Sequence, residues 1–122
     1  MPLLEVELVI SPNETPRATL AAEIADAAAT VFGSPAGHVW VRLRFLAREH
    51  YAENGGPLPD DLSPAFVTVL HARSPLGDER TAEAARLTGA LARACGRAAE
   101  SVHLFYQPDG AGRVFFGGRP AG

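Results

Sequence analysis

The sequence predicts an α+β protein in which two fused β-α-β units form a four-stranded mixed sheet with two helices on one face. Two observations lead to this prediction. Each half of the 122-residue chain reads as strand, helix and strand, and residues 11–41 align without a gap on the stretch that begins at Ser74. We therefore expect a single domain over residues 1–122, with internal repeats at about residues 2–46 and 64–106.

The first unit begins with a strand over residues 3–10, which are rich in β-branched residues and alternate in polarity. Thr15 followed by Pro16 is typical of an N-cap and the first residue of a helix, and Gly33 is a typical helix stop. A second strand is predicted over residues 38–46. The buried stripe of the helix is expected at four positions with helical spacing: Leu20, Ile24, Ala28 and Val31.

The second unit repeats this order. Residues 65–72 are predicted to form a strand, Asp78 to cap a helix that ends at Gly96, and residues 101–106 to form the closing strand. Residues 112–118 are expected to add a short terminal strand. The buried stripe of the second helix is predicted at Ala84, Leu87, Leu91 and Ala94.

The arrangement of the two units carries the functional argument. Each β-α-β unit has two parallel strands with its helix on one face of the sheet. A twofold relation between the units makes their first strands antiparallel neighbours, so the start of one lies beside the end of the other. We therefore expect Pro2 to lie close to His71 and Arg73.

The face of the sheet away from the helices is predicted to be polar. Alternation puts Trp40, Arg42 and Arg44 on this face, opposite the side that Val39, Val41, Leu43 and Phe45 present to the helices. Glu5 and Glu7 on the first strand would complete a cross-strand charge ladder. Two interpretations stay open: a solvated polar surface, or a polar lining where several sheets face one another in a ring.

Composition excludes several classes of protein. A net charge of −3 does not favour nucleic acid or an anionic membrane surface as a partner. No apolar run approaches the roughly 20 residues that span a bilayer, and no secretion signal is evident. Cys95 is the only cysteine, which fits a cytoplasmic location, and its apolar helical surroundings predict a buried thiol. No zinc-type cluster, phosphate loop or Ser-His-Asp pattern is evident, so we expect no metal and no cofactor.

Several local stretches, in this order along the chain, resemble the tautomerase superfamily. They are "MPLL" with proline second, "FGSPAGHV", "TVLHARS" and "VFFGGR". The longer-chain members, which include macrophage migration inhibitory factor, malonate semialdehyde decarboxylase and cis-3-chloroacrylic acid dehalogenase, are the better match in length. The resemblance covers essentially the whole chain. It implies a homotrimer with sites at the subunit boundaries, each containing an N-terminal proline.

The chain also departs from this family's patterns. The migration-inhibitory members carry a lysine where this sequence has Ser34, and the small tautomerases an arginine where it has Trp40. The dehalogenase's C-terminal glutamate aligns with Phe115. Arg73 has only the more distant Arg80 as a companion, whereas the dehalogenase and decarboxylase have two arginines close together. These departures bear on which reaction the resemblance implies.

Pro2 is the candidate catalytic residue. Removal of Met1 would leave it with a free secondary amine, and an α-amino group in simple peptides titrates around pH 8. Apolar walls from Leu3, Tyr106 and Phe116, with a cation at Arg73, would lower the pKa of that amine. Such an amine could move a proton between two atoms of a keto–enol pair. The alternative is that Pro2 merely follows a processed methionine.

Each of the other candidate residues has a structural interpretation as well as a functional one. Arg73 is expected to hold a substrate carboxylate through a two-point hydrogen-bonded fork, or to be a solvated turn residue. His71 is expected beside it as a substrate contact or as a structural neighbour. His38 aligns with a position at which the decarboxylase-like sequences have an Asp that assists water, and a cap on the strand start is the favoured alternative. Trp40 and Tyr51 would wall a pocket or pack in the core or an interface.

These residues together predict a cofactor-free tautomerase of small 2-oxo or enol carboxylic acids, with Pro2 as general base and a homotrimer as the assembly. One alternative is a hydratase, dehalogenase or decarboxylase of small unsaturated or 3-oxo acids that uses the same site. A second alternative is a non-catalytic trimeric binding protein of the same fold. Retention of Met1 would leave the Pro2 nitrogen as an amide and favour this second alternative.

Overall fold

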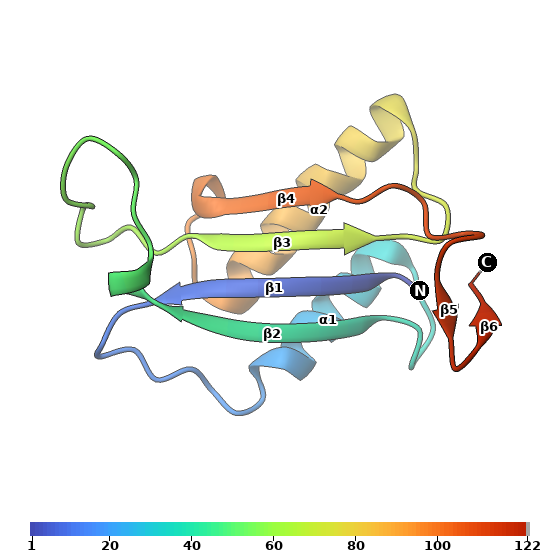
Figure 1. Ribbon diagram of the computed structural model, residues 1–122, viewed down its shortest axis with the longest axis horizontal. Helices are drawn as coiled ribbons and strands as arrows, with labels where there is room; N and C mark the ends of the chain where they lie inside the picture. Colours follow the sequence, from blue (N-terminus) through green and yellow to red (C-terminus); the bar gives the residue numbers. More distant parts are fainter. Residues whose placement is uncertain (122) are drawn as a thin grey trace.

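The computed structural model describes residues 1–121 and contains one four-stranded sheet with the strand order β2-β1-β3-β4 (Figure 1). The strands β1 and β2 are parallel, as are β3 and β4, while the central pair β1 and β3 is antiparallel. Both helices lie on one face of the sheet (Figure 1). The predicted α+β class, with two β-α-β units and a mixed sheet, is confirmed. The elements of the two units are β1 Leu3–Ile10, α1 Leu20–Phe32, β2 Trp40–Ala47, β3 Ala65–Leu70, α2 Gly77–Cys95 and β4 Val102–Tyr106.

The core lies between the sheet and the two helices. Alternate residues of β1 and β3 point into it and are almost fully buried, and the helices contribute one apolar stripe each. Cys95 is buried here, as predicted, and burial raises the pKa of its thiol. The largest buried side chains of the sheet and helices are Leu4, Val6, Leu8, Val67, Val69, Ile24, Leu87 and Leu91.

The first helix starts later than the sequence predicted. It begins at Leu20 with Thr19 at the N-cap position, so the prediction of a cap at Thr15 and a first helical turn at Pro16 was wrong. The guanidinium of Arg17 explains the difference, because it hydrogen bonds to the Ala94 carbonyl oxygen at the end of α2, 3.0 Å away. That contact holds the preceding segment against the other helix rather than in a helical turn.

The second helix starts one residue before the predicted cap. Leu76 is the N-cap residue, with an extended backbone, and Asp78 lies within the first turn. Gly77 has a positive φ of 54°, which lets the chain turn sharply into the helix. Asp78 still favours this helix end, through its charge near the N-terminal dipole. Within the predicted stripe, Ala84 is half-buried and its neighbour Glu83 is buried instead.

Two strand predictions also need correction. The third strand ends at Leu70 rather than at residue 72, because residues 71 and 72 continue as a bend whose carbonyl oxygens accept hydrogen bonds from the segment after β4. Phe45 was expected to meet the helices but is 46% exposed. It lies near the end of an edge strand, and α1 begins too late in the chain to cover it.

Two 3₁₀ turns and a C-terminal hairpin complete the chain. The turns are Arg48–His50 (η1) and Ala99–Ser101 (η2). The predicted terminal strand is a two-stranded hairpin, β5 Phe115–Phe116 and β6 Arg119–Pro120, which lies at the end of the sheet where β1 begins (Figure 1). None of the helices within residues 1–121 is both long enough and apolar enough to cross a membrane.

Candidate active site at the start of the central strand

Pro2 lies buried at the start of β1, between two neighbouring strands. Its carbonyl oxygen accepts a hydrogen bond from the Trp40 backbone N–H on β2, at 3.1 Å. On the other side, β1 pairs with β3 in a register that matches Leu3 with Leu70. One further step along this antiparallel register brings Pro2 opposite His71. The strand arrangement therefore brings Pro2 beside the end of β3, as the twofold argument predicted.

The hydrogen-bond pattern indicates how Pro2 and His71 face each other. Pairs along an antiparallel ladder alternate between hydrogen-bonded and non-hydrogen-bonded, and Val9 belongs to a bonded pair because its N–H donates to the Pro64 carbonyl at 3.0 Å. Counting along β1, Pro2 and His71 form a non-hydrogen-bonded pair, the type with side chains closest together. Both side chains are on the helix side of the sheet, and the Pro2 nitrogen points toward β2.

His71 is held by buried polar partners. Its Nε2 lies 2.9 Å from Glu83 Oε2, and the Tyr106 hydroxyl donates to the same oxygen at 2.6 Å. The Phe32 ring meets the imidazole edge-on, with a centroid distance of 5.0 Å. Burial, together with the hydrogen bond to Glu83, raises the pKa of Tyr106, so this phenol stays protonated. Tyr106 is thus a partner of His71 rather than only an apolar wall.

Arg73 lies in the bend that follows β3 and is exposed. Within residues 1–121, its guanidinium makes no hydrogen bond or ion pair. Arg80, the more distant companion, is engaged: its Nε donates to the Pro75 carbonyl at 2.9 Å and its guanidinium carbon lies 5.8 Å from the centre of the Tyr106 ring. Arg73 is therefore free to bind an anion at this end of the sheet.

An aromatic pair borders the same end. The rings of Trp40 and Phe116 meet edge-on with a centroid distance of 4.7 Å, so the C-terminal hairpin packs on the start of β2. Beside them lies a cleft of about 410 Å³. It is bounded by the open face of the sheet and by the segment after β4, with Leu3, Leu70, Gly110, Arg113 and Val114 among its lining residues.

Met1 occupies space next to this cleft. A methyl group added at Gly110 would lie 2.8 Å from the Met1 Cε and 3.2 Å from a Val114 methyl carbon. Gly110 and Val114 both line the cleft. The side chain of Met1 therefore fills the region between Pro2 and the cleft.

Two predicted site residues lie elsewhere or stand apart. Tyr51 follows η1 at the opposite end of the sheet, where its ring packs 5.7 Å from Phe66 and its hydroxyl donates to Glu53 at 2.6 Å. Within one chain it does not meet Pro2. His38 is exposed just before β2 and its backbone N–H donates to the Pro35 carbonyl at 3.2 Å. It lies near the start of β1 through the register that matches Leu3 with Trp40.

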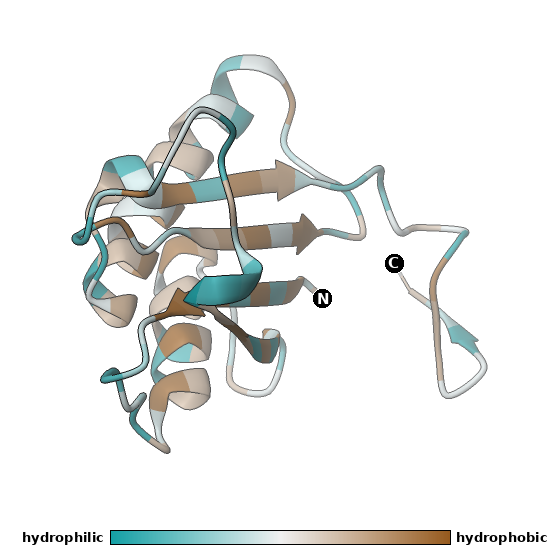
Figure 2. Ribbon diagram, turned by 60° about the vertical axis from the view of Figure 1, so that its left-hand side comes forward, coloured by the Kyte–Doolittle hydropathy of each residue, from teal (hydrophilic) through white to brown (hydrophobic). Residues whose placement is uncertain are grey.

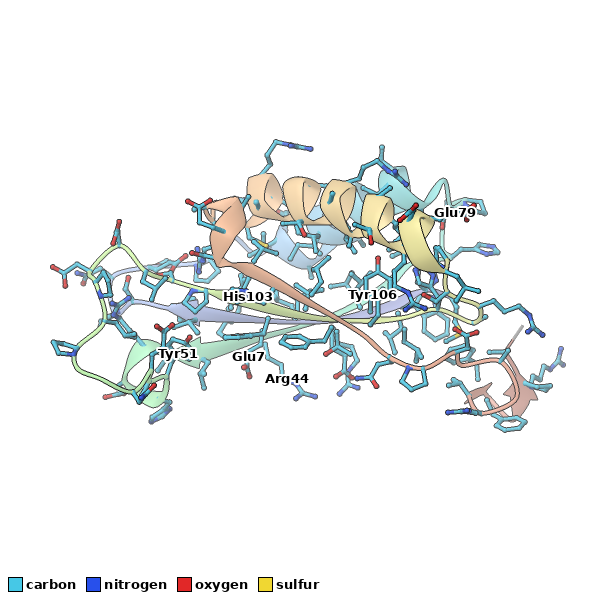
Figure 3. All side chains as sticks on the ribbon, turned by 90° about the horizontal axis from the view of Figure 1, so that it is seen from above. Glu7, Arg44, Tyr51, Glu79, His103 and Tyr106 are labelled. Atoms are coloured by element: carbon cyan, nitrogen blue, oxygen red, sulfur yellow. The ribbon has the colours of Figure 1, made fainter. Side chains whose placement is uncertain are left out.

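The open face of the sheet carries the predicted charges. Arg42 forms an ion pair with Glu5 at 2.8 Å, and Figure 3 shows Glu7 and Arg44 on the side of the sheet away from the helices. Apolar residues share this face: Phe105 is 53% exposed and Trp40 is 46% exposed. Figure 2 shows these strands carrying brown apolar segments beside teal polar ones. Tyr51 packs on Phe66 at one end of this mixed surface, and the segment after β4 borders it at the other, while Phe105 stays half-exposed.

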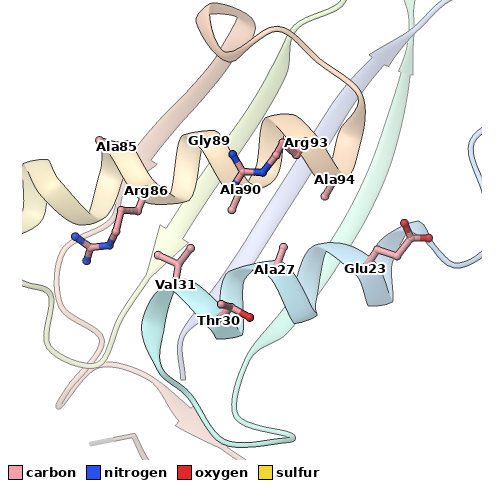
Figure 4. A pocket seen from close by; sticks show the side chains of 10 residues that line it. All are labelled: Glu23, Ala27, Thr30, Val31, Ala85, Arg86, Gly89, Ala90, Arg93 and Ala94. Carbon is pink, nitrogen blue, oxygen red and sulfur yellow. The ribbon is translucent and has the colours of Figure 1, made fainter.

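A second hollow lies between the helices, on the far side of the molecule from the open face. Figure 4 shows this groove between α1 and α2, which is about 780 Å³ in volume and is lined by four alanines together with Gly89, Val31 and polar or charged residues that include Arg86 and Arg93. None of the residues predicted from the sequence to form a site lines it. Across residues 1–121, no three His, Cys, Asp or Glu side chains are grouped to hold a metal ion.

Sequence reasoning missed two residues at the Pro2 end. Glu83, on α2, organises His71 and Tyr106, although a lone glutamate in an exposed-looking helix gives no sign of this. The alignment of the two halves contains a signal, because it pairs Glu83 with Leu20, a predicted core position. Arg113 lines the cleft and depends on how the C-terminal segment folds back, for which the sequence carries no signal.

Comparison with known proteins shows the fold. No protein-family model matches the chain, and no curated protein matches it. Macrophage migration inhibitory factor from Trichinella spiralis has a TM-score of 0.71 at 13% identity, with 98% of this chain and 99% of that chain covered. The F6 fused 4-OT wild-type asymmetric trimer has a TM-score of 0.73 at 19% identity, covering 97% and 94%. Pt0534, solved after inactivation by 2-oxo-3-pentynoate, has a TM-score of 0.72 at 20% identity, also covering 97% and 94%.

The three similar structures share one architecture with this chain over nearly their whole length. The fold is that of the tautomerase superfamily, as the sequence resemblance implied. Identities of 13–20% make this a statement about the fold, and the activity has to be argued from the residues.

Proposed function

We propose that this protein is a cofactor-free tautomerase of small 2-oxo or enol carboxylic acids in the cytoplasm, with the N-terminal amine of Pro2 as general base. The observation that carries the proposal is the position of Pro2. It is buried at the start of a central strand, its carbonyl is fixed by the Trp40 N–H, and an unpaired arginine follows the adjacent strand end. The tautomerase-superfamily fold supports the same assignment.

The proposed chemistry requires a neutral amine. Removal of Met1 would convert the Pro2 nitrogen from an amide into a secondary amine with one lone pair. Burial, together with a positive charge at Arg73 after the adjacent strand end, would lower the pKa of such an amine. The neutral amine would take the enol hydroxyl proton and, as a cation, return a proton to the carbon two atoms away, which completes a 1,3-keto–enol isomerisation.

Arginines would hold the acid. A guanidinium binds a carboxylate through two parallel hydrogen bonds and also stabilises charge that develops on an enolate. Arg73 is the proposed ligand of the substrate carboxylate, with Arg113 in the cleft as a second cation. Trp40 and Phe116 supply an apolar wall. Loss of Met1, which lies against Gly110, would extend the cleft toward the Pro2 nitrogen.

We also propose a homotrimer. The open sheet face combines exposed aromatics with paired charges, and a sheet covered on one side needs a second cover. The fused 4-OT structures are described as trimers, which supports the same assembly here. In a trimer, Tyr51 could join the site of a neighbouring subunit. A stable monomer in light scattering at micromolar concentration would contradict this assembly.

Covalent labelling tests the proposed base. Because Pt0534 is described as inactivated by 2-oxo-3-pentynoate, this reagent is a suitable probe for a nucleophilic amine in the same fold. We expect one equivalent to attach to Pro2, with loss of enol turnover, and no labelling after the N-terminus is acetylated. Attachment at another residue with Pro2 unmodified would contradict the assignment.

A further inference from the structure

A buried polar cluster lies on the helix side of the sheet, at the end where β1 begins. It consists of Glu83 on α2, His71 just after β3 and Tyr106 at the end of β4, and Figure 3 shows Tyr106 on this side. The Glu83 side chain is 10% exposed, and among residues 1–121 only the Arg97 side chain, at the other end of the sheet, is a comparably buried charged group. The side chain of His71 is 11% exposed. The cluster is therefore shielded from solvent.

The hydrogen bonds define which nitrogen of the imidazole carries a proton. Glu83 Oε2 accepts from the Tyr106 hydroxyl at 2.6 Å, and the His71 Nε2 lies 2.9 Å from the same oxygen. A carboxylate accepts only, so His71 Nε2 must carry the hydrogen that it donates. One carboxylate oxygen of Glu83 therefore accepts two hydrogen bonds, from His71 and from Tyr106.

This cluster adjoins the proposed base. The paired register ends at Leu3 and Leu70, and one further step would put His71 opposite Pro2, with both side chains on the helix side of the sheet. The backbone of His71 cannot turn away, because its carbonyl oxygen accepts the Gly110 N–H at 2.8 Å. Phe32 closes the other side of the imidazole at a centroid distance of 5.0 Å.

A purely structural role gives a weak account of this arrangement. Burying a carboxylate costs desolvation energy that hydrogen bonds only partly offset, and apolar residues of similar volume often serve stability as well. The position aligned with Glu83 in the first half is Leu20, which is 4% exposed and entirely apolar. The fold itself therefore accepts a leucine at this position.

We propose that Glu83, Tyr106 and His71 form a positioning cluster that fixes the His71 imidazole on the helix side of the sheet, next to the start of β1, and keeps a buried carboxylate on that side of the N-terminal amine. This inference rests on the proposed function, because it concerns the amine that remains after Met1 is removed. It adds a second, opposing charge to the site: Arg73 disfavours the protonated amine, and Glu83 favours it.

The charges around the cluster determine the direction of the effect. The cations that face it are Arg80, next to the Tyr106 ring, and Arg86, farther along α2. Neither is altered by a change at Glu83. Because Glu83 stabilises the protonated amine, replacing its carboxylate by an amide should lower the pKa of the amine. The cluster would thus tune the balance between a basic and a protonated Pro2.

The test is an NMR titration of protein labelled with ¹⁵N-proline and ¹⁵N-histidine, whose mass shows that it begins at Pro2. In the wild type, we expect His71 Nε2 to carry a proton at pH 7, because it faces the Glu83 carboxylate. In Glu83→Gln, we expect the midpoint of the Pro2 amine titration to fall by about one pH unit. Glu79→Gln removes the same charge from an exposed position on the same helix and should leave the midpoint unchanged.

Each outcome decides the inference. A His71 Nε2 that carries no proton at pH 7, or an amine midpoint in folded Glu83→Gln equal to that of the wild type, would overturn it. The imidazole measurement needs no variant and stands even if Glu83→Gln fails to fold. Neither arm uses substrate, so lack of enol turnover would contradict the proposed function while leaving this inference intact. A native protein that retains Met1 would overturn both.

Discussion

Each end of the sheet has a buried proline just before a central strand, but the two proline nitrogens differ in their chemistry. At one end, β3 follows Pro64, which is fully buried and accepts the Val9 N–H at 3.0 Å. At the other end, β1 follows Pro2, which is also buried and accepts the Trp40 N–H at 3.1 Å. The nitrogen of Pro64 is an amide inside the chain and cannot titrate. Only Pro2 can become an amine, so the same architecture supplies one structural proline and one candidate base.

The two ends also differ in whether their arginine has a partner within the protein. At the Pro64 end, Arg97 is 7% exposed and donates to Glu14 at 2.8 Å and to the Val9 carbonyl at 2.9 Å. At the Pro2 end, Arg73 is exposed and, within residues 1–121, its guanidinium has no partner. One end of the sheet is closed by its own ion pair. The other has a cation available for an anion from outside.

Substitution of the two prolines should give the largest difference in kcat between the two ends of the sheet. Pro2→Ala keeps an amine but replaces the ring nitrogen with a primary one, and should reduce kcat for an enol substrate by roughly 10²–10⁴, the usual contribution of a general base. Pro64→Ala should leave kcat unchanged in folded protein, because its nitrogen lies in a peptide bond. Steady-state kinetics with phenylenolpyruvate measures both. Equal losses in the two variants would remove the distinction between the ends.

The unpaired arginine gives the next effect. Arg73→Ala should lower kcat/KM by about 2–3 kcal/mol in transition-state terms and raise KM, because a charge-assisted contact to the substrate carboxylate is lost. The free energy of unfolding should hardly change, since Arg73 is exposed and unpaired within residues 1–121. Unchanged kinetics on every carboxylate that turns over would end this assignment.

Replacement of Arg97, the arginine that has partners within the protein, should lower stability and leave activity unchanged. Arg97→Ala leaves Glu14 and the Val9 carbonyl without their buried donor, so the free energy of unfolding should fall by about 2 kcal/mol. Urea unfolding followed by circular dichroism measures this. At temperatures where the variant is folded, kcat/KM should match that of the wild type. A variant of full stability with lost activity would place Arg97 in a site.

The smallest effect concerns the thiol near the Pro64 end. Cys95 precedes Arg97, whose guanidinium donates to the Cys95 carbonyl at 3.2 Å, and burial raises the pKa of its thiol. A raised pKa means less thiolate at any pH below it, so alkylation of native protein at pH 8 should be at least about tenfold slower than that of free cysteine. Reaction at the free-cysteine rate would show that this end opens readily.

The sequence predicted the topology better than the limits of the elements. Strand alternation and the matching halves predicted the antiparallel central pair, with the start of β1 beside the end of β3, because period and order determine which strands can pair. The start of α1 was missed because it depends on Arg17 reaching Ala94, a contact between residues distant in the sequence. The single-domain limits of 1–122 and the repeat limits of 2–46 and 64–106 stay predictions.

The polar cluster was harder to predict for a physical reason. A glutamate within an alanine-rich helix reads as solvent-exposed, since a buried carboxylate needs partners that only the tertiary structure supplies. Those partners come from β3 and β4, 12 and 23 residues away from Glu83 in the sequence. Two signals indicated that its side chain faces the core: its alignment with Leu20, and its position four residues before Leu87 of the predicted stripe.

The most direct test compares two forms of the protein that differ only before Pro2. One form begins at Pro2, as verified by intact-mass spectrometry, and the other retains Met1. The account predicts turnover of phenylenolpyruvate or a 2-hydroxymuconate-type enol by the first form, with a rate that depends on one group titrating near neutrality, and none by the second. Equal rates in the two forms would show that the Pro2 amine is not the base.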